Sequence, residues 1–253
     1  MATFKSYLRL LRLERTFYFV EILLGVIFAL NFDLSKLNFV FLIQLFFLFQ
    51  GMYAGLYIIN DIVDYKKDRL HPIKSKRVIA SGEISRNRGL LVALILIILS
   101  ISISFFVNKL LFYFEIFFII YNQIYTFLLK KITYFFPFSN AVTHCARFVM
   151  GMMLFGIFDK YLLALALFFL SFGLTSIKKY EEIKVESSSN KKKFEIIYFI
   201  FIIVSFFIIS SALFFASSTE KLGILFLDIF YLLYILALFF NKSKNLLIKF
   251  LFQ

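Results

Sequence analysis

The chain alternates long apolar runs with short polar connections, and this pattern predicts its architecture. An α-helix needs roughly 20 apolar residues to cross a bilayer about 30 Å thick. The runs predict eight transmembrane helices at 16–32, 38–60, 89–107, 110–129, 135–157, 161–177, 194–216 and 222–240. Residues 245–253 are apolar but too short to cross, so they form either an interfacial tail or a truncated ninth helix. We therefore expect an all-α, polytopic membrane bundle of eight to nine helices.

Composition supports a membrane protein and leaves no room for a second domain. Hydrophobic residues make up 62% of the 253 residues, whereas soluble domains contain about 45–50%. We expect one integral membrane domain over residues 1–253. Residues 1–15 predict a short amphipathic helix at the interface, with Tyr7, Leu8, Leu10, Leu11 and Leu13 available to face lipid. The single cysteine, Cys145, excludes an internal disulfide.

The distribution of basic residues predicts the orientation of the bundle. The net charge is +13. Such a charge is also found in nucleic-acid-binding proteins, but in a membrane protein the positive-inside rule accounts for it. With the N-terminus in the cytoplasm, the turns on the outer side hold only Lys36, Lys109, Lys160 and Lys221. We therefore expect no nucleic-acid partner and a multi-pass protein of the cell membrane whose cavity and active site face the cytoplasm.

One cytoplasmic stretch gathers acidic side chains directly after an apolar run. Residues 60–77 read NDIVDYKKDRLHPIKSKR. If the preceding helix continues through them, Asp61, Asp64 and Asp68 fall within about 60° of one another. Three aligned carboxylates call for a cation, and oxygen ligands of this kind suit Mg²⁺ held together with substrate phosphates. The alternative is a solvated loop whose Lys and Arg only set topology.

Cations near this stripe complete a candidate site for a metal-bound diphosphate. Lys74 and Arg77 follow the stripe directly. Arg147 lies inside a predicted span, where an arginine should face a cavity and have an anionic partner. The alternative is that Arg147 pairs with Glu21 or Glu115 and only pins helices together.

Two further cytoplasmic helix ends carry candidate substrate-binding residues. Tyr125 and Lys130 end the span at 110–129, where a phenol and an amine can contact an anionic oxygen. Lys178, Lys179 and Glu182 end the span at 161–177, and a lysine pair followed by glutamates suits a phosphate clamp. For both groups the alternative is the interfacial aromatic and lysine belt of membrane helices.

These motifs resemble the UbiA prenyltransferase superfamily. The run Asn60-Asp61-x-x-Asp64-x-x-x-Asp68 looks like its first Asp-rich motif, and DRLHPIKSKRVIASG is similar to its common DRxHPxKxxRPIASG, with Val78 in place of proline. The second motif, DxxxD, is missing. The KKYEE in its place is similar to the KRxxE of the decaprenyl-phosphate phosphoribosyltransferase branch, which also shows a Tyr and Lys pair like Tyr125 and Lys130 and an LRxxxG like Ala146-Arg147-x-x-x-Gly151.

The resemblance implies an all-helical, Mg²⁺-dependent intramembrane transferase. Asp61, Asp64 and Asp68 would bind the metal, Asn60 would contact the substrate, and Lys74, Arg77 and Arg147 would neutralise the leaving diphosphate. The branch features favour transfer from 5-phosphoribosyl diphosphate, a phosphorylated sugar diphosphate, to a polyprenyl phosphate lipid. The alternative is a prenyltransferase that moves an isoprenoid from its diphosphate to an aromatic or glycerol-phosphate acceptor. A transporter is the rival of another class. Isoprenoid length, the acceptor and a homo-oligomeric state stay open.

Overall fold

The computed structural model describes residues 3–129, 132, 135–185 and 191–240, and within these ranges all regular structure is helical. The chain divides into two compact units. Unit 1 contains residues 1–132 and 147–158, and unit 2 contains residues 133–146 and 159–253. The expected tail or ninth helix at 245–253 lies outside the described residues.

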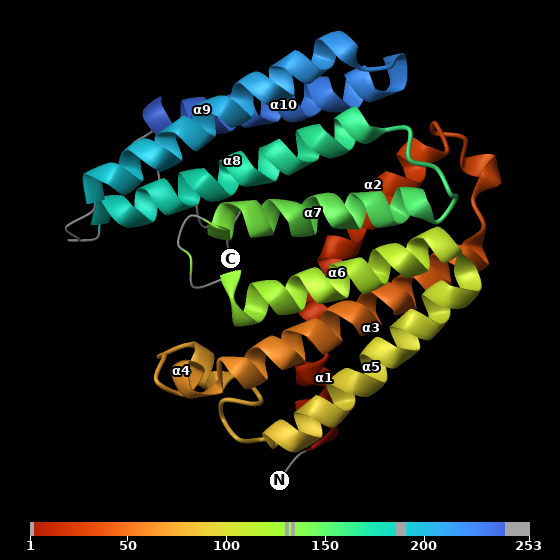
Figure 1. Ribbon diagram of the computed structural model, residues 1–253, viewed down its shortest axis with the longest axis vertical. Helices are drawn as coiled ribbons and strands as arrows, with labels where there is room; N and C mark the ends of the chain where they lie inside the picture. The colour runs from red at the N-terminus through yellow and green to blue at the C-terminus, as the bar shows by residue number, and fades with distance from the viewer. Residues whose placement is uncertain (1–2, 130–131, 133–134, 186–190, 241–253) are drawn as a thin grey trace. The chain divides into compact units, whose positions relative to one another are not determined.

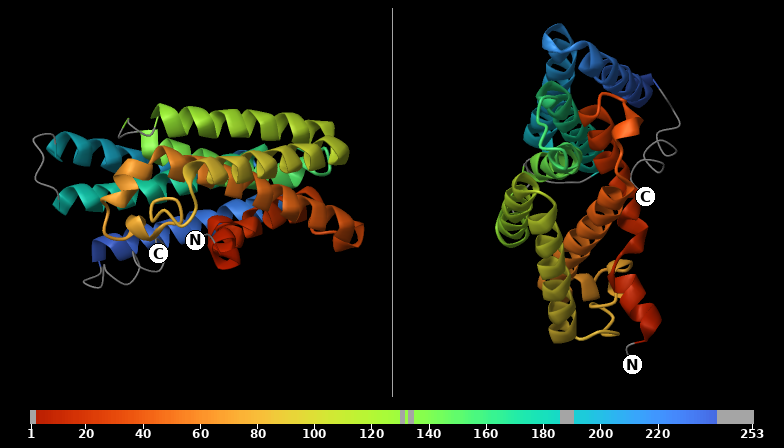
Figure 2. Two further views of the ribbon diagram at one scale, coloured as in Figure 1. Left: turned by 90° about the horizontal axis from the view of Figure 1, so that it is seen from below. Right: turned by 90° about the vertical axis from the view of Figure 1, so that its right-hand side faces the viewer.

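Unit 1 begins with a short surface helix and continues with the first spans (Figures 1 and 2). Its elements are α1 (Phe4–Leu10), η1 (Leu13–Tyr18), α2 (Phe19–Ala29), η2 (Leu34–Lys36), α3 (Phe39–Val63), α4 (Tyr65–Arg69), η3 (Lys74–Lys76), α5 (Arg86–Val107) and α6 (Lys109–Phe127). The last part of α7 (Phe135–Met153) also belongs to this unit. Unit 2 takes the first part of α7 together with α8 (Tyr161–Val185), α9 (Lys191–Phe215) and α10 (Ser218–Phe240).

Five of the described helices are long and apolar enough to cross a membrane, namely α3, α5, α6, α8 and α9. The bounds of α3, α5, α6 and α9 lie within about three residues of the predicted runs, whereas α8 continues to Val185, eight residues beyond the predicted end at 177. Three other predicted runs also form helices, α2, α7 and α10, but do not meet this criterion of length and composition within the described residues. Helix α2 has 11 residues, and the predicted start of its run at residue 16 falls in η1.

Close backbone contacts set the helix packing of unit 1. Helices α3 and α5 pack side by side where α3 carries Gly51 and Gly55, four residues apart. A Cβ on Gly55 would lie 3.0 Å from the carbonyl oxygen of Ala93 in α5. Helix α2 crosses the last part of α7 even more closely, because a Cβ on Gly25 would overlap the carbonyl oxygen of Phe148. Small residues at such crossings let membrane helices approach through their backbones.

The N-terminal segment is fastened to the loop between α4 and α5, and not only to lipid as the sequence predicts. Leu10 is buried in a core with Ile58 and Ile79, so its expected exposure to lipid is wrong. Figure 2 shows α1 beside this loop. Hydrogen bonds from the hydroxyl of Ser6 and the guanidinium of Arg9 lower the pKa of Glu83, whose carboxylate accepts both at 2.8 Å. The N-terminal segment is thereby held over the end of α3.

Candidate active site

The carboxylates of the acidic stretch are held by an arginine that follows them in the chain. Nη1 of Arg77 lies 3.1 Å from Oδ1 of Asp61 and 2.7 Å from Oδ2 of Asp68. Both carboxylates are buried, with 6% of Asp61 and 2% of Asp68 exposed. Because buried carboxylates need a counter-charge, the two acidic side chains and one cation form a single cluster at the end of α3.

A second arginine reaches this cluster from the N-terminal segment. Nη2 of Arg12 lies 2.7 Å from both carboxylate oxygens of Asp61, and its guanidinium lies 5.2 Å from the ring centroid of Tyr57. Arg12 has φ 51° and ψ 48°, a left-handed conformation that a non-glycine residue adopts only when its surroundings demand it. The kink turns the chain between α1 and η1, which brings the Arg12 side chain to Asp61.

The helix does not run unbroken through the three aspartates, as the stripe prediction assumes. Helix α3 ends at Val63, and Asp64 is its C-cap. The backbone bonds from Asp64 to the carbonyl of Asn60 and from Asp68 to the carbonyl of Asp64 persist, at 2.9 and 2.8 Å. Among the residues described by the structure, no group of three or more His, Cys, Asp or Glu could hold a metal ion. The cluster joins Asp61 and Asp68, while Asp64 interacts electrostatically with Tyr125 at the end of α6.

The donor set nevertheless fits a divalent cation. Oxygen atoms of Asp61 and Asp68 both approach one cationic nitrogen of Arg77, so the two buried carboxylates already enclose a position for positive charge. Carboxylate oxygens are the ligands that Mg²⁺ prefers, usually one or two of them with substrate phosphates. The assignment of Asp61, Asp64 and Asp68 as metal ligands stays a prediction.

Arg147 has the anionic partner that its position in a span requires. Only 3% of the residue is exposed. Its Nε lies 3.3 Å from Oε2 of Glu21, and its guanidinium lies 4.3 Å from the ring centroid of Tyr18 and 5.4 Å from that of Tyr53. The crossing of α2 and α7 at Gly25 brings Glu21 to Arg147. Of the two acidic residues that the sequence suggests as partners, Glu21 and Glu115, the structure pairs Arg147 with Glu21. A catalytic role of Arg147 stays a prediction.

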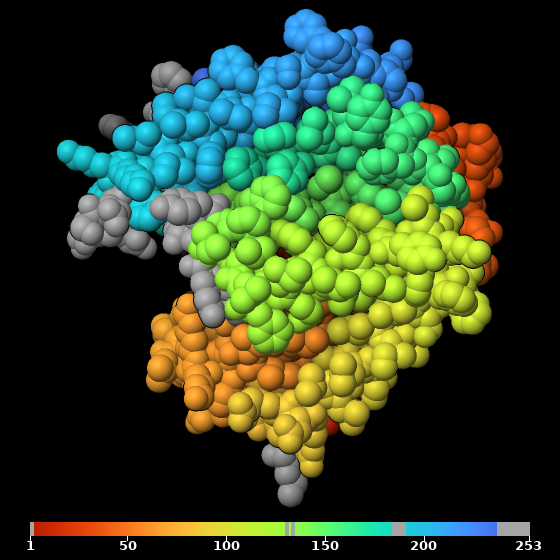
Figure 3. Space-filling view, in the orientation of Figure 1, coloured from red at the N-terminus to blue at the C-terminus, as the bar shows by residue number. Residues whose placement is uncertain are grey.

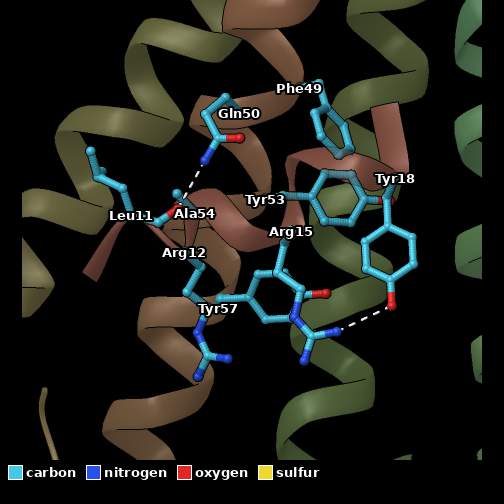
Figure 4. A pocket seen from close by; sticks show the side chains of 9 residues that line it. All are labelled: Leu11, Arg12, Arg15, Tyr18, Phe49, Gln50, Tyr53, Ala54 and Tyr57. Carbon is cyan, nitrogen blue, oxygen red and sulfur yellow. Dashed lines mark hydrogen bonds between the residues drawn. The ribbon is translucent and has the colours of Figure 1, made fainter. Parts of the chain in front are cut away.

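A hollow lies next to these tyrosines, between the N-terminal segment and α3 (Figure 4). Its lining includes Arg12, Arg15, Tyr18, Tyr53 and Tyr57. Figure 4 shows the Arg15 guanidinium directed to the hydroxyl of Tyr18, at 3.1 Å. The hollow therefore brings cationic and aromatic side chains together, and one of the cations, Arg12, also contacts Asp61.

Sequence reasoning missed most of this lining. The sequence predicts Arg12 on an interfacial helix and indicates no role for Tyr18, Tyr53 and Tyr57. The available signal is the spacing of Arg9 and Arg12, three residues apart, ahead of the first apolar run. That spacing puts two cations on one side of a helical segment, although the left-handed kink at Arg12 could not be inferred from it.

The remaining candidate residues of the first unit are Asn60, Lys74, Tyr125 and Lys130. The backbone of Asn60 accepts the bond from Asp64, and the backbone N–H of Lys74 donates to Nδ1 of His71 at 3.2 Å. Tyr125 is half-buried. Lys130 lies outside the described residues.

The candidates of unit 2 form a local pair. Nζ of Lys179 lies 2.6 Å from Oε2 of Glu182, one turn further along α8, and 4.9 Å from the ring centroid of Phe136. Lys178 is half-buried at the same helix end. A lysine that is paired within its own helix and packed on an aromatic ring fits the interfacial-belt alternative as well as it fits a phosphate clamp.

Comparison with known proteins places these features in a family. The model of the UbiA prenyltransferase family matches residues 18–251. No curated protein sequence matches the chain. A solved structure of a digeranylgeranylglyceryl phosphate synthase is similar in fold, with 21% identity, a TM-score of 0.74, and 92% of this chain and 85% of that chain covered. A UbiA homologue from Archaeoglobus fulgidus bound to GPP and Mg²⁺ is similar at 18% identity and a TM-score of 0.72, with 90% and 85% covered.

Proposed function

Because the chain belongs to the UbiA prenyltransferase family, and is an integral membrane protein, we propose that it transfers an isoprenoid from an isoprenyl diphosphate to an acceptor nucleophile, with Mg²⁺ as cofactor. The observation that carries the proposal is the buried pair Asp61 and Asp68, which encloses a cation position at the end of a membrane helix. The fold neighbour bound to GPP and Mg²⁺ supports the choice of donor and metal. One family model spans parts of both units, which supports a single domain over residues 1–253.

Each residue of the cluster has a role in this proposal. Asp61 and Asp68, with Asp64 one turn away, would hold the metal ion. A divalent cation there supplies positive charge to the leaving diphosphate and so stabilises the charge that develops as the bond breaks. Arg12 and Arg77 are the cations next to a diphosphate bound at this place, and they would donate charge-assisted hydrogen bonds to its oxygens.

The reaction needs no covalent intermediate with the protein. The bond between C1 of the isoprenoid and the diphosphate oxygen breaks, and C1 bonds to the acceptor, which loses a proton to water. The acceptor is an aromatic ring or a glycerol-phosphate hydroxyl. We place the site on the cytoplasmic face, because the loop from 61 to 88 that contains it is rich in Lys and Arg, and basic residues concentrate in the cytoplasmic loops of membrane proteins.

Phosphoribosyl transfer, the leading hypothesis from the sequence, gains no support from the contacts at the end of α8. It rests on the KKYEE in place of DxxxD, on the Tyr125 and Lys130 pair and on Ala146-Arg147-x-x-x-Gly151. The pairing of Lys179 with Glu182 explains two side chains of the first feature locally. It remains the competing donor in the test below.

The test offers both donors to the same purified protein. Reconstituted protein is incubated with Mg²⁺, a mixed panel of aromatic and glycerol-phosphate acceptors, a polyprenyl phosphate, and either labelled geranyl diphosphate or labelled 5-phosphoribosyl diphosphate. We expect a labelled product from geranyl diphosphate that is lost with EDTA and with Asp61→Asn. Asp33→Asn, on the exposed turn before α3, is the matched control and should keep full activity. A product from 5-phosphoribosyl diphosphate alone would overturn the proposal.

A further inference from the structure

The segment from α4 through η3 exposes large apolar side chains outside the candidate spans. Within residues 65–77, here named the surface loop, Leu70 is 88% and Ile73 75% exposed. Exposing such side chains to water is unfavourable, and a hydrophobic surface of this kind usually marks a contact with a membrane or a partner.

The exposure belongs to a well-defined turn. Nδ1 of His71 accepts hydrogen bonds from the backbone N–H groups of Ile73 and Lys74, both at 3.2 Å. The backbone N–H of His71 donates to the carbonyl of Asp68 at 3.1 Å. These bonds fix the backbone on both sides of Leu70 and Ile73, so the loop presents its apolar residues in one conformation.

The loop also connects two candidate spans. It lies between α3 and α5, which are both long and apolar enough to cross the membrane. The ring of Tyr65 lies 5.1 Å from the guanidinium of Arg86, the first residue of α5, and 5.5 Å from that of Arg69. This contact ties α4 to the beginning of α5, so the loop is held beside the ends of both candidate spans. Figure 3 shows part of the loop, in orange, on the surface of unit 1.

The charge of the loop identifies what covers it. Lys66, Lys67, Arg69 and Lys76 are exposed and Lys74 is half-buried, whereas the carboxylate of Asp68 is buried against Arg77. The outward surface is therefore strongly cationic around two apolar residues. Anionic phospholipids complement both properties, since lysine and arginine bind their headgroups and apolar side chains enter the interface.

We propose that the surface loop is an interfacial anchor that inserts Leu70 and Ile73 between lipid headgroups and binds anionic phospholipid through its lysines. The loop contains Asp68 and ends at Arg77, and Nη1 of Arg77 lies 2.7 Å from Oδ2 of Asp68 in the buried cluster. Contact with lipid thus fixes the segment that carries two residues of the proposed site. A bilayer of anionic lipid should hold this segment in place more firmly than a zwitterionic one.

The experiment measures the depth of the loop without substrate. Leu70→Cys and Ile73→Cys, each in a Cys145→Ala background, are labelled with an NBD fluorophore and reconstituted in vesicles of phosphatidylcholine alone or with one quarter phosphatidylglycerol. In the anionic vesicles we expect emission at shorter wavelength and quenching by lipid spin-labelled near the headgroup. The additional change Lys66→Gln/Lys67→Gln should reduce both effects, because it removes two exposed cations.

A label at Ser35→Cys is the matched control, since Ser35 lies on an exposed turn before α3 that has a single lysine, Lys36, beside it. Its emission should not depend on phosphatidylglycerol. Emission typical of water at both loop positions in anionic vesicles would overturn the anchor. A shift that occurs only after geranyl diphosphate and Mg²⁺ are added would also overturn it, because the loop would then be a lid over the substrate. These readouts do not depend on catalysis, so their failure is separate from a failure of the proposed function.

Discussion

The pairing of Arg147 with Glu21 can be tested by a double-mutant cycle. Arg147→Met keeps the length and the apolar stem of the side chain but removes the charge. Glu21 then retains a charge that is 26% exposed and has lost the cation 3.3 Å away. Removing one partner of a buried ion pair costs about 3–5 kcal/mol, and the partial exposure of Glu21 places this case near the lower end. The loss of the contacts with Tyr18 and Tyr53 adds about 0.5–1 kcal/mol each.

Thermal unfolding in detergent measures this effect. The combined cost of about 4–5 kcal/mol lowers the melting temperature by roughly 8–20 °C in a chain of this length, at about 2–4 °C per kcal/mol. Glu21→Gln alone should also destabilise, whereas Arg147→Met combined with Glu21→Gln should recover much of the loss, since no isolated charge remains. Arg15→Met is the control, because Arg15 also lies near Tyr18, at 5.8 Å, but on the side of the hollow. Single variants that melt with the wild type, or a double variant whose loss is the sum of the two, would refute the ion pair.

Three further predictions concern the N-terminal segment and the helix crossing. Arg12→Lys should lower activity by about tenfold or more at unchanged melting temperature, since an amine keeps the charge but loses the planar guanidinium that lies over Tyr57 and carries the further donors for a bound diphosphate, and equal rates would contradict this role. The folded protein lowers the pKa of Glu83, so the ionised carboxylate stabilises the protein above its ordinary pKa of 4.5, and this stabilisation is lost as the pH falls through the lowered pKa. The difference in melting temperature between the wild type and Glu83→Gln should therefore vanish on acidification. A difference that stays constant with pH would exclude the contact. Gly25→Ala should lower the free energy of unfolding by about 1–3 kcal/mol, because the added Cβ would overlap the carbonyl oxygen of Phe148. The control Val20→Ala, on the exposed side of α2, should change the melting temperature little.

The positions of the long helices could be predicted from the sequence, and their rotations could not. Hydropathy identifies α3 and α5 within a few residues because lipid demands long apolar helices. It also requires a partner for Arg147, yet Glu21 and Glu115 satisfied that requirement equally. The backbone contact of Gly25 with Phe148 decides for Glu21, and such a contact depends on tertiary packing that periodicity does not contain.

The sequence predicts the part of the candidate site whose residues are near one another in the chain, and not the part that depends on tertiary packing. Asp61, Asp68 and Arg77 are close in the chain, so local spacing suffices to bring them together. Arg12 is distant in the chain and reaches Asp61 through a left-handed kink, which no residue pattern marked. Asp64 sits at the end of α3 and not within it, because the helix ends where the apolar run gives way to charged residues.

The most direct test of the account is donor turnover by the wild-type protein and Asp68→Asn, measured side by side with added Mg²⁺. Asp68 is buried on Arg77, so melting temperature is recorded on the same samples to separate catalysis from folding. The account predicts Mg²⁺-dependent release of diphosphate from geranyl diphosphate by the wild type and a loss of about two or more powers of ten in the variant at comparable folding. Equal turnover by a folded Asp68→Asn, or turnover that does not depend on Mg²⁺, would contradict the claim that these carboxylates hold the metal-bound leaving group.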